Sequence, residues 1–108
     1  MMKEFGQMMG MLKNLPKLKE ETERLQAKIR EIQAEGSAGA GMVTVKVNGE
    51  MQVIRCTISD DAWKMQDKEM LEDLMAAAVN QAVQKVRDLV AQETGKMAMG
   101  MGMGLPVE

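Results

Sequence analysis

Valines alternate with polar residues in Val43-Thr44-Val45-Lys46-Val47, and Asn48-Gly49 follows directly. Because successive side chains of a strand point to opposite faces, this alternation predicts a strand with one apolar face. Asn and Gly both tolerate the positive φ angles of a two-residue type I′ turn, so the pair predicts a β-hairpin. The chain must therefore build at least a small antiparallel sheet, and another element must cover the valine face.

The alternation resumes after the turn, with Ile54, Cys56 and Ile58 on one face. A two-residue loop places Val43 opposite Ile54, so the apolar positions of the two strands agree. In this register Cys56 shares the apolar face, and we expect its thiol to be buried and unreactive.

A helical pattern precedes the hairpin. Apolar residues recur there in alternating steps of three and four, with Thr22 in one slot: Leu15, Leu18, Leu25, Ile29 and Ile32. We expect a helix that begins near Pro16 and ends between Ile32 and Gly36, after a loosely ordered Met- and Gly-rich segment over residues 1–14. Its narrow apolar stripe either packs against a second helix of the same chain or pairs with the same helix of another copy.

A second long helix is predicted after the hairpin. Ser59 can cap a short turn that holds Trp63, Asp67 is suited to cap the helix itself, and Gly95 is suited to end it after about 27 residues. Residues beyond Gly95 are rich in Met and Gly and lack periodicity, which is typical of a flexible tail. We therefore divide the chain into a folded domain, 1–94, and a tail, 95–108.

Composition argues against catalysis. The chain has no His and one Cys, so the commonest general base, the commonest zinc ligand and an internal disulfide are all missing. Carboxylates between Asp60 and Asp73 do not match a calcium loop, and the methionines from Met97 to Met103 have no Cys or His beside them to complete a copper site. We expect no enzyme, no cofactor or metal, and no small-molecule substrate.

Neither a signal peptide nor a membrane-spanning run is predicted, which favours a cytoplasmic location without a membrane partner.

Charge is unevenly distributed along the chain, although the net charge is only −2. Four lysines stand against one glutamate before Glu20, whereas six acidic residues stand against two lysines between Asp60 and Asp73. Helical i,i+4 spacing pairs some of the basic residues (Lys17–Glu21, Lys19–Glu23 and Glu20–Arg24) and leaves Lys13, Lys28 and Arg30 without such partners. The candidate nucleic-acid contacts are the basic residues of the first helix and of the position just before it: Lys13, Lys17, Lys19, Arg24, Lys28 and Arg30.

Two stretches resemble the YbaB/EbfC family of bacterial nucleoid-associated proteins. Gly39–Gly49 is similar to the hairpin of that family, and Asp67–Ala82 is similar to its second long helix. The resemblance implies an α+β fold of order α-β-β-β-α, with a small antiparallel sheet, long helices at both ends and a tweezers-like homodimer. It also implies a first strand near Gln33–Ala38, so that the first helix stops before Ile32. Pro16 departs from the family pattern, because the first helix of the family is normally unbroken.

Together these features predict a non-enzymatic, nucleoid-associated homodimer that binds duplex DNA with little or relaxed sequence specificity and so influences gene expression. Lys and Arg side chains along projecting first helices would neutralise the phosphates. The alternative is a protein–protein adaptor that uses an exposed heptad helix and Met-rich surfaces.

Overall fold

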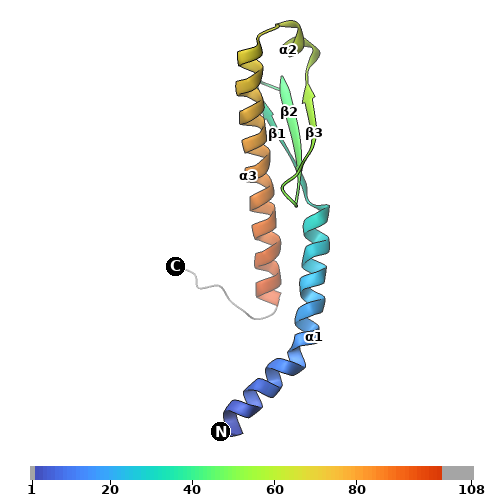
Figure 1. Ribbon diagram of the computed structural model, residues 1–108, viewed down its shortest axis with the longest axis vertical. Coiled ribbons are helices and arrows are strands. Elements are labelled where there is room, and N and C mark those ends of the chain that lie inside the picture. Colours follow the sequence, from blue (N-terminus) through green and yellow to red (C-terminus); the bar gives the residue numbers. More distant parts are fainter. Residues whose placement is uncertain (1, 101–108) are drawn as a thin grey trace.

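The computed structural model describes the backbone of residues 2–100 and the side chains of residues 15–100. A three-stranded antiparallel sheet of order β1-β2-β3 is covered on one face by the last long helix, while the first long helix extends away from one end of the sheet (Figure 1). The molecule is elongated, 74 × 29 × 18 Å. In chain order the elements are α1 (Met2–Glu31), β1 (Gln33–Ala38), β2 (Val43–Asn48), β3 (Val53–Ile58), α2 (Asp60–Lys64) and α3 (Lys68–Gly100). This order confirms the predicted α-β-β-β-α fold, including the strand expected at Gln33–Ala38.

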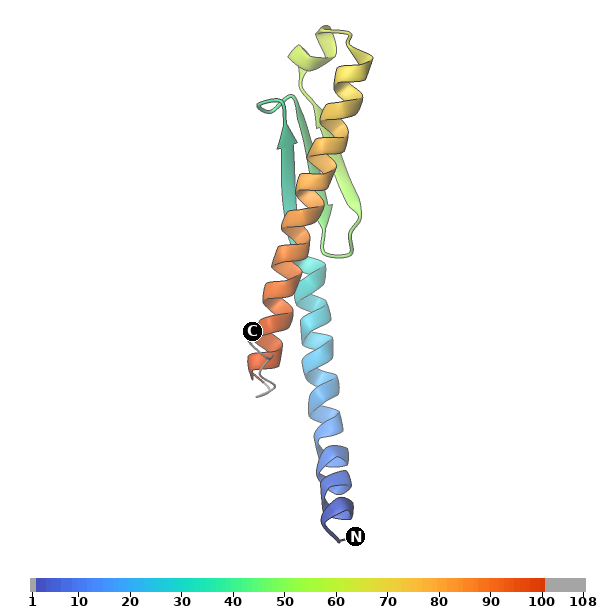
Figure 2. The ribbon, with the colours of Figure 1, turned by 90° about the vertical axis from the view of Figure 1, so that its left-hand side faces the viewer.

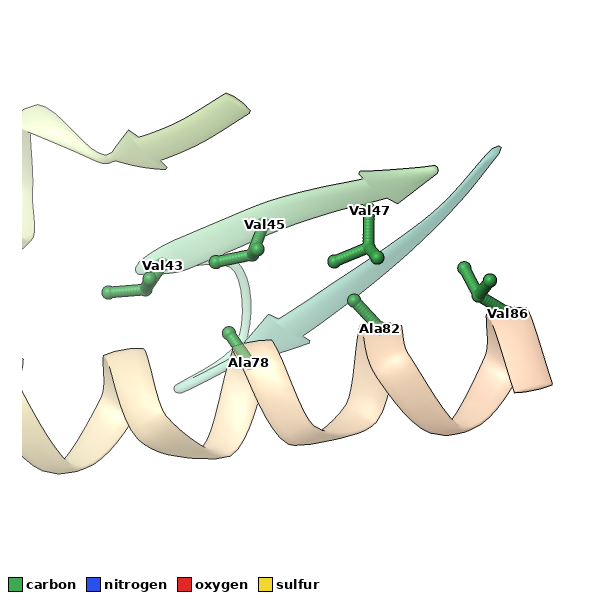
Figure 3. Close-up of a cluster of buried hydrophobic side chains, with 6 residues drawn as sticks. All are labelled: Val43, Val45, Val47, Ala78, Ala82 and Val86. Carbon is green, nitrogen blue, oxygen red and sulfur yellow. The ribbon is translucent and has the colours of Figure 1, made fainter. Parts of the chain in front are cut away.

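The core lies between β2 and α3. Val43, Val45 and Val47 are fully buried and point toward a row of small side chains at four-residue spacing on α3, Ala78, Ala82 and Val86 (Figure 3). Each fully buried valine contributes about 1.5–3 kcal/mol relative to an exposed one. The predicted valine face is therefore confirmed, and the alanines let the helix approach it closely.

Close approach also depends on glycine. A Cβ atom on Gly36 of β1 would collide with the backbone of Ala78 and Ala82. Gly36 thus serves helix–sheet packing, because its lack of a side chain lets the backbones of β1 and α3 come close together.

We expect Gly36→Ala to lower the free energy of unfolding by roughly 2 kcal/mol or more, because backbone atoms cannot move aside as side chains do. The melting temperature of a chain of this size should fall by about 10 °C. Gly95→Ala is the matched control. Nothing lies within 4 Å of a Cβ at Gly95 inside α3, so this change should raise stability by about 0.5–1 kcal/mol. Thermal unfolding followed by circular dichroism measures both, and equal behaviour of the two variants would contradict the close packing.

The hairpin register differs from the predicted one. Val43 lies opposite Ile58 rather than Ile54, and a bulge near Val47 sets Val53 opposite that residue. The reason is the Asn48 side chain, whose Oδ1 accepts hydrogen bonds from the N–H groups of Glu50 and Gln52 and so organises a four-residue loop. The loop then leaves Gly49 buried, where its N–H donates to the carbonyl of Ile32.

Cys56 is exposed, so the expectation of a buried thiol is wrong for the single chain. Cys56 does lie opposite Val45, on the apolar face of the sheet, as predicted. However, α3 packs over β1 and β2 and leaves β3 uncovered. Which strands the helix covers is a tertiary property that the alternation does not encode.

Both long helices extend further than predicted at one end, but α1 ends at Glu31, before the range Ile32–Gly36 expected from its apolar stripe, because β1 begins at Gln33. This earlier end is the one that the family resemblance implied. α1 begins at Met2 rather than near Pro16, and Figure 1 shows a bend in its N-terminal part, as expected when a proline lies inside a helix. α3 continues through Gly95 to Gly100, so the predicted C-cap is wrong. An interior glycine costs a helix only about 1 kcal/mol, and the Lys, Met and Ala residues that follow are good helix formers. Residues 101–108 of the predicted tail lie outside the described part of the chain, and the boundary at residue 94 stays a prediction.

The predicted N-caps of α2 and α3 are confirmed. Ser59 Oγ accepts a hydrogen bond from the Ala62 N–H at 3.1 Å, which begins α2. Asp67 Oδ1 accepts one from the Met70 N–H at 3.0 Å, which begins α3.

Candidate nucleic-acid interface

The two long helices continue past the end of the sheet, and their free parts lie side by side (Figures 1 and 2). The final turns of α3 lie beside the second half of α1, and α1 extends beyond them toward the N-terminus. Because these segments leave the sheet behind, side chains on them are open to a large partner.

A groove of about 240 Å³ runs between the two helices. Four basic side chains line it, three from α1 and one from α3, namely Lys17, Arg24, Lys28 and Lys96. The remaining lining consists of two carboxylates, Glu21 and Glu93, the apolar Leu25 and Met97, and Gly100. We call this surface the inter-arm groove.

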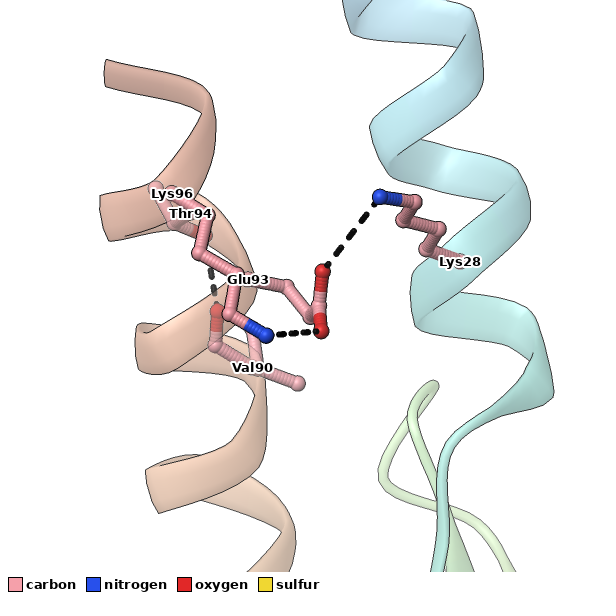
Figure 4. A network of polar contacts seen from close by, with 5 residues as sticks. All are labelled: Lys28, Val90, Glu93, Thr94 and Lys96. Atoms are coloured by element: carbon pink, nitrogen blue, oxygen red, sulfur yellow. Dashed lines mark hydrogen bonds and ion pairs between the residues drawn. The ribbon is translucent and has the colours of Figure 1, made fainter. Parts of the chain in front are cut away.

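The carboxylates of the groove are engaged in ion pairs. Glu93 on α3 lies between Lys28 of α1, at 3.9 Å, and Lys96 of its own helix, at 3.4 Å (Figure 4). Glu21 pairs with Arg24 at 3.1 Å. Within residues 15–100, none of the three predicted i,i+4 pairs of α1 comes within ion-pair distance, and Arg24 pairs with Glu21 at i,i+3 instead of with Glu20.

The structure thus brings together part of the predicted site. Lys17, Arg24 and Lys28 line the inter-arm groove, whereas Lys19 and Arg30 are exposed on α1 outside its lining. The side chain of Lys13 lies outside the described ones. Sequence reasoning missed Lys96, because a glycine at position 95 predicts the end of the helix. It also missed the partner that Glu93 provides for Lys28, since no pattern within α1 contains a residue of α3.

The acidic run lies far from the inter-arm groove. Its six carboxylates belong to α2, to the turn after it and to the first turns of α3, at the opposite end of the long axis (Figure 1). Among the described residues, no group of three or more acidic or Cys side chains could hold a metal ion. The predicted charge segregation therefore corresponds to a separation in space.

A second exposed surface is apolar. Three residues of β3 lie opposite the buried valines of β2, and we call them the β3 face: Val53, Cys56 and Ile58. Beside this face, Ile58, Trp63, Leu71 and Met75 line a hollow of about 460 Å³. Trp63 is 67% exposed and Val53 is 52% exposed. A single chain leaves these side chains in contact with water.

A three-stranded sheet with a long helix at each end of the chain, and with basic side chains gathered between the two helices, defines a class of helix–sheet–helix protein. The YbaB/EbfC DNA-binding family matches residues 3–101, so the chain belongs to this family. The family comprises nucleoid-associated DNA-binding proteins rather than enzymes.

Individual relatives agree with this assignment. A nucleoid-associated protein of Alkaliphilus metalliredigens is 40% identical over 89% of this chain and 84% of its own length. A nucleoid-associated protein of Francisella philomiragia is 41% identical over 92% of this chain and 89% of its own. The crystal structure of the uncharacterized protein HP0035 from Helicobacter pylori superimposes with a TM-score of 0.67 at 26% identity, covering 86% of this chain and 95% of that one.

No helix within the described residues combines the length and the apolar character that crossing a bilayer requires.

Proposed function

We propose that this protein is a homodimer that binds duplex DNA at the nucleoid with little sequence specificity, through phosphate contacts made by the inter-arm groove and the exposed faces of α1. The observation that carries the proposal is the convergence of four cations from two helices, beyond the end of the sheet and away from the acidic run. A protein of net charge −2 can bind a polyanion only if its basic groups are separated from its acidic ones.

The chemistry of the groove favours backbone contacts over base reading. Lys17, Lys28 and Lys96 end in ammonium groups on flexible stems, which act as point charges toward phosphate. Contacts to phosphate position a protein on the duplex but carry no sequence information. The proposed relaxed specificity follows from this composition.

The homodimer is supported by the β3 face and by the way the opposite sheet edge is closed. At β1, the Gln81 side chain accepts a hydrogen bond from the Ser37 N–H at 2.7 Å, and Lys85 donates one to the Glu35 carbonyl at 2.9 Å. Side chains of α3 thus satisfy backbone groups at that edge. β3 has no such cover within the described residues, and an exposed strand edge with apolar side chains is suited to a second copy.

A gel-shift titration of duplex DNA over a series of salt concentrations tests the proposed function. The logarithm of the affinity should fall linearly with the logarithm of the salt concentration, by about 0.9 per phosphate contact. Two unrelated duplexes of equal length should give similar curves. Absence of binding to either duplex at low salt would overturn the proposal.

An adaptor function is the second candidate, and the exposed stripe of α1 favours it. Leu15 is 51% exposed and Leu18 is 37% exposed, so the N-terminal part of the stripe has no cover from α3. Such residues suit a partner helix. If duplex binding is absent at low salt while the protein remains folded, the adaptor function becomes the better explanation.

A further inference from the structure

Glu93 occupies a particular position in the inter-arm groove. Its carboxylate faces Lys28 across the groove and Lys96 on its own helix, at 3.9 and 3.4 Å (Figure 4). Its side chain is only 22% exposed, whereas those of Lys28 and Lys96 are 57% and 71% exposed. The anion is therefore held between the helices, while the ammonium groups reach toward solvent.

The Glu93 carboxylate binds the same two ammonium groups that a DNA phosphate would bind. Both are oxyanions that accept hydrogen bonds from ammonium groups. A lysine already paired with a protein carboxylate holds a smaller counter-ion atmosphere and gains less from a phosphate contact. Phosphate must therefore displace Glu93 or share the two lysines with it.

We propose that Glu93 is an internal counter-ion that restrains the contact of Lys28 and Lys96 with a phosphate oxyanion of DNA. The inference rests on the proposed function and deepens it. The carboxylate weakens binding and makes it less sensitive to salt, which keeps a protein of relaxed specificity exchangeable along the duplex. Glu93 acts through the two lysines and needs no contact with DNA.

The test is Glu93→Gln, which keeps the shape of the side chain and removes its charge. Affinity for a duplex at low salt should increase about three- to tenfold, and the salt dependence should steepen by up to about 0.9 for each lysine released. Glu93→Asp retains the charge and should bind more nearly like the parent. Glu72→Gln is the matched control. It also breaks a lysine pair, with Lys68 at 3.7 Å, but at the acidic end of the molecule, so it should leave affinity and slope unchanged.

Substituting the two lysines distinguishes the counter-ion role of Glu93 from a merely structural role. In a background carrying Lys28→Gln and Lys96→Gln, the additional Glu93→Gln change should no longer increase affinity. A gain that persists in this background, a Glu72→Gln effect equal to that of Glu93→Gln, or an unchanged affinity and slope of Glu93→Gln would each overturn the inference. In those cases the parent still binds DNA and the proposed function stands. A parent that does not bind duplex DNA would overturn both.

Discussion

Replacing Lys17, Arg24 and Lys28 together with glutamine is expected to lower the affinity for duplex DNA on the order of 100-fold at low salt. All three side chains of α1 line the inter-arm groove, so the variant removes most of its positive charge. The salt dependence should flatten by about 0.9 for each phosphate that the variant no longer neutralises. The decrease in affinity should be similar for duplexes of different sequence, because phosphate contacts do not distinguish bases. Titrations at several salt concentrations measure both quantities.

Two control variants test whether the loss of DNA affinity is specific to the inter-arm groove. Lys64 and Lys68 belong to the acidic end of the molecule, and their replacement by glutamine should leave the salt slope unchanged. Lys46 and Arg55 lie opposite each other on β2 and β3, on the outer face of the sheet. If the Lys46 and Arg55 variant had a reduced affinity while the groove variant bound like the parent, the DNA-binding surface would lie on the sheet and not between the helices.

Cys56→Asp is expected to convert the protein from a dimer to a monomer and, as a consequence, to weaken DNA binding by about 10²-fold or more. The thiol is exposed in a single chain, so an aspartate costs little in the isolated protomer. In the proposed dimer the same position lies in an apolar interface, where an unpaired charge is strongly unfavourable. Dissociation of the dimer then removes the bivalent attachment to DNA, for which a factor of about 10²–10⁴ is typical.

Light scattering measures the first effect directly. The parent should have about twice the chain mass of 11.9 kDa, and the Cys56→Asp variant should have the chain mass. Cys56→Ala keeps the surface apolar and should remain a dimer that binds DNA. The parent thiol should also react slowly with a thiol reagent at concentrations where the dimer is populated, and faster on dilution. A monomeric parent with a freely reactive Cys56 would refute the proposed interface.

The two surfaces assign separate roles to separate ends of the fold. The β3 face would join two copies, whereas the inter-arm groove and α1 would contact DNA. The Cys56→Asp variant should therefore retain the salt-dependent weak binding of a single groove, and the groove variant should retain the dimer mass. Such independence is expected when altered positions are far apart and share no partners.

Local patterns by themselves determined the strands of the hairpin, the N-caps and the valine core of this protein, whereas the first strand was implied only by the family resemblance. The period-two alternation of Val43, Val45 and Val47 specifies a buried strand face whatever helix covers it, because the pleat sends every second side chain to one side. Ser59 and Asp67 likewise cap the turns that follow them through contacts within three residues. The separation of basic and acidic segments along the chain also carried over into space.

Only the tertiary structure decided which of these elements meet. The register of the hairpin follows from the Asn48 side chain and from the contact of Gly49 with Ile32. The exposure of Cys56 follows from α3 covering two strands of three. Lys96 joins the basic residues of α1 because α3 continues past Gly95, whose local cost the neighbouring helix formers offset. Glu93 lies before that glycine and meets Lys28 because α3 packs beside α1. Contacts between residues 28 and 93 have no signature in local sequence, because they depend on how two helices pack against a sheet and not on the preferences of either segment.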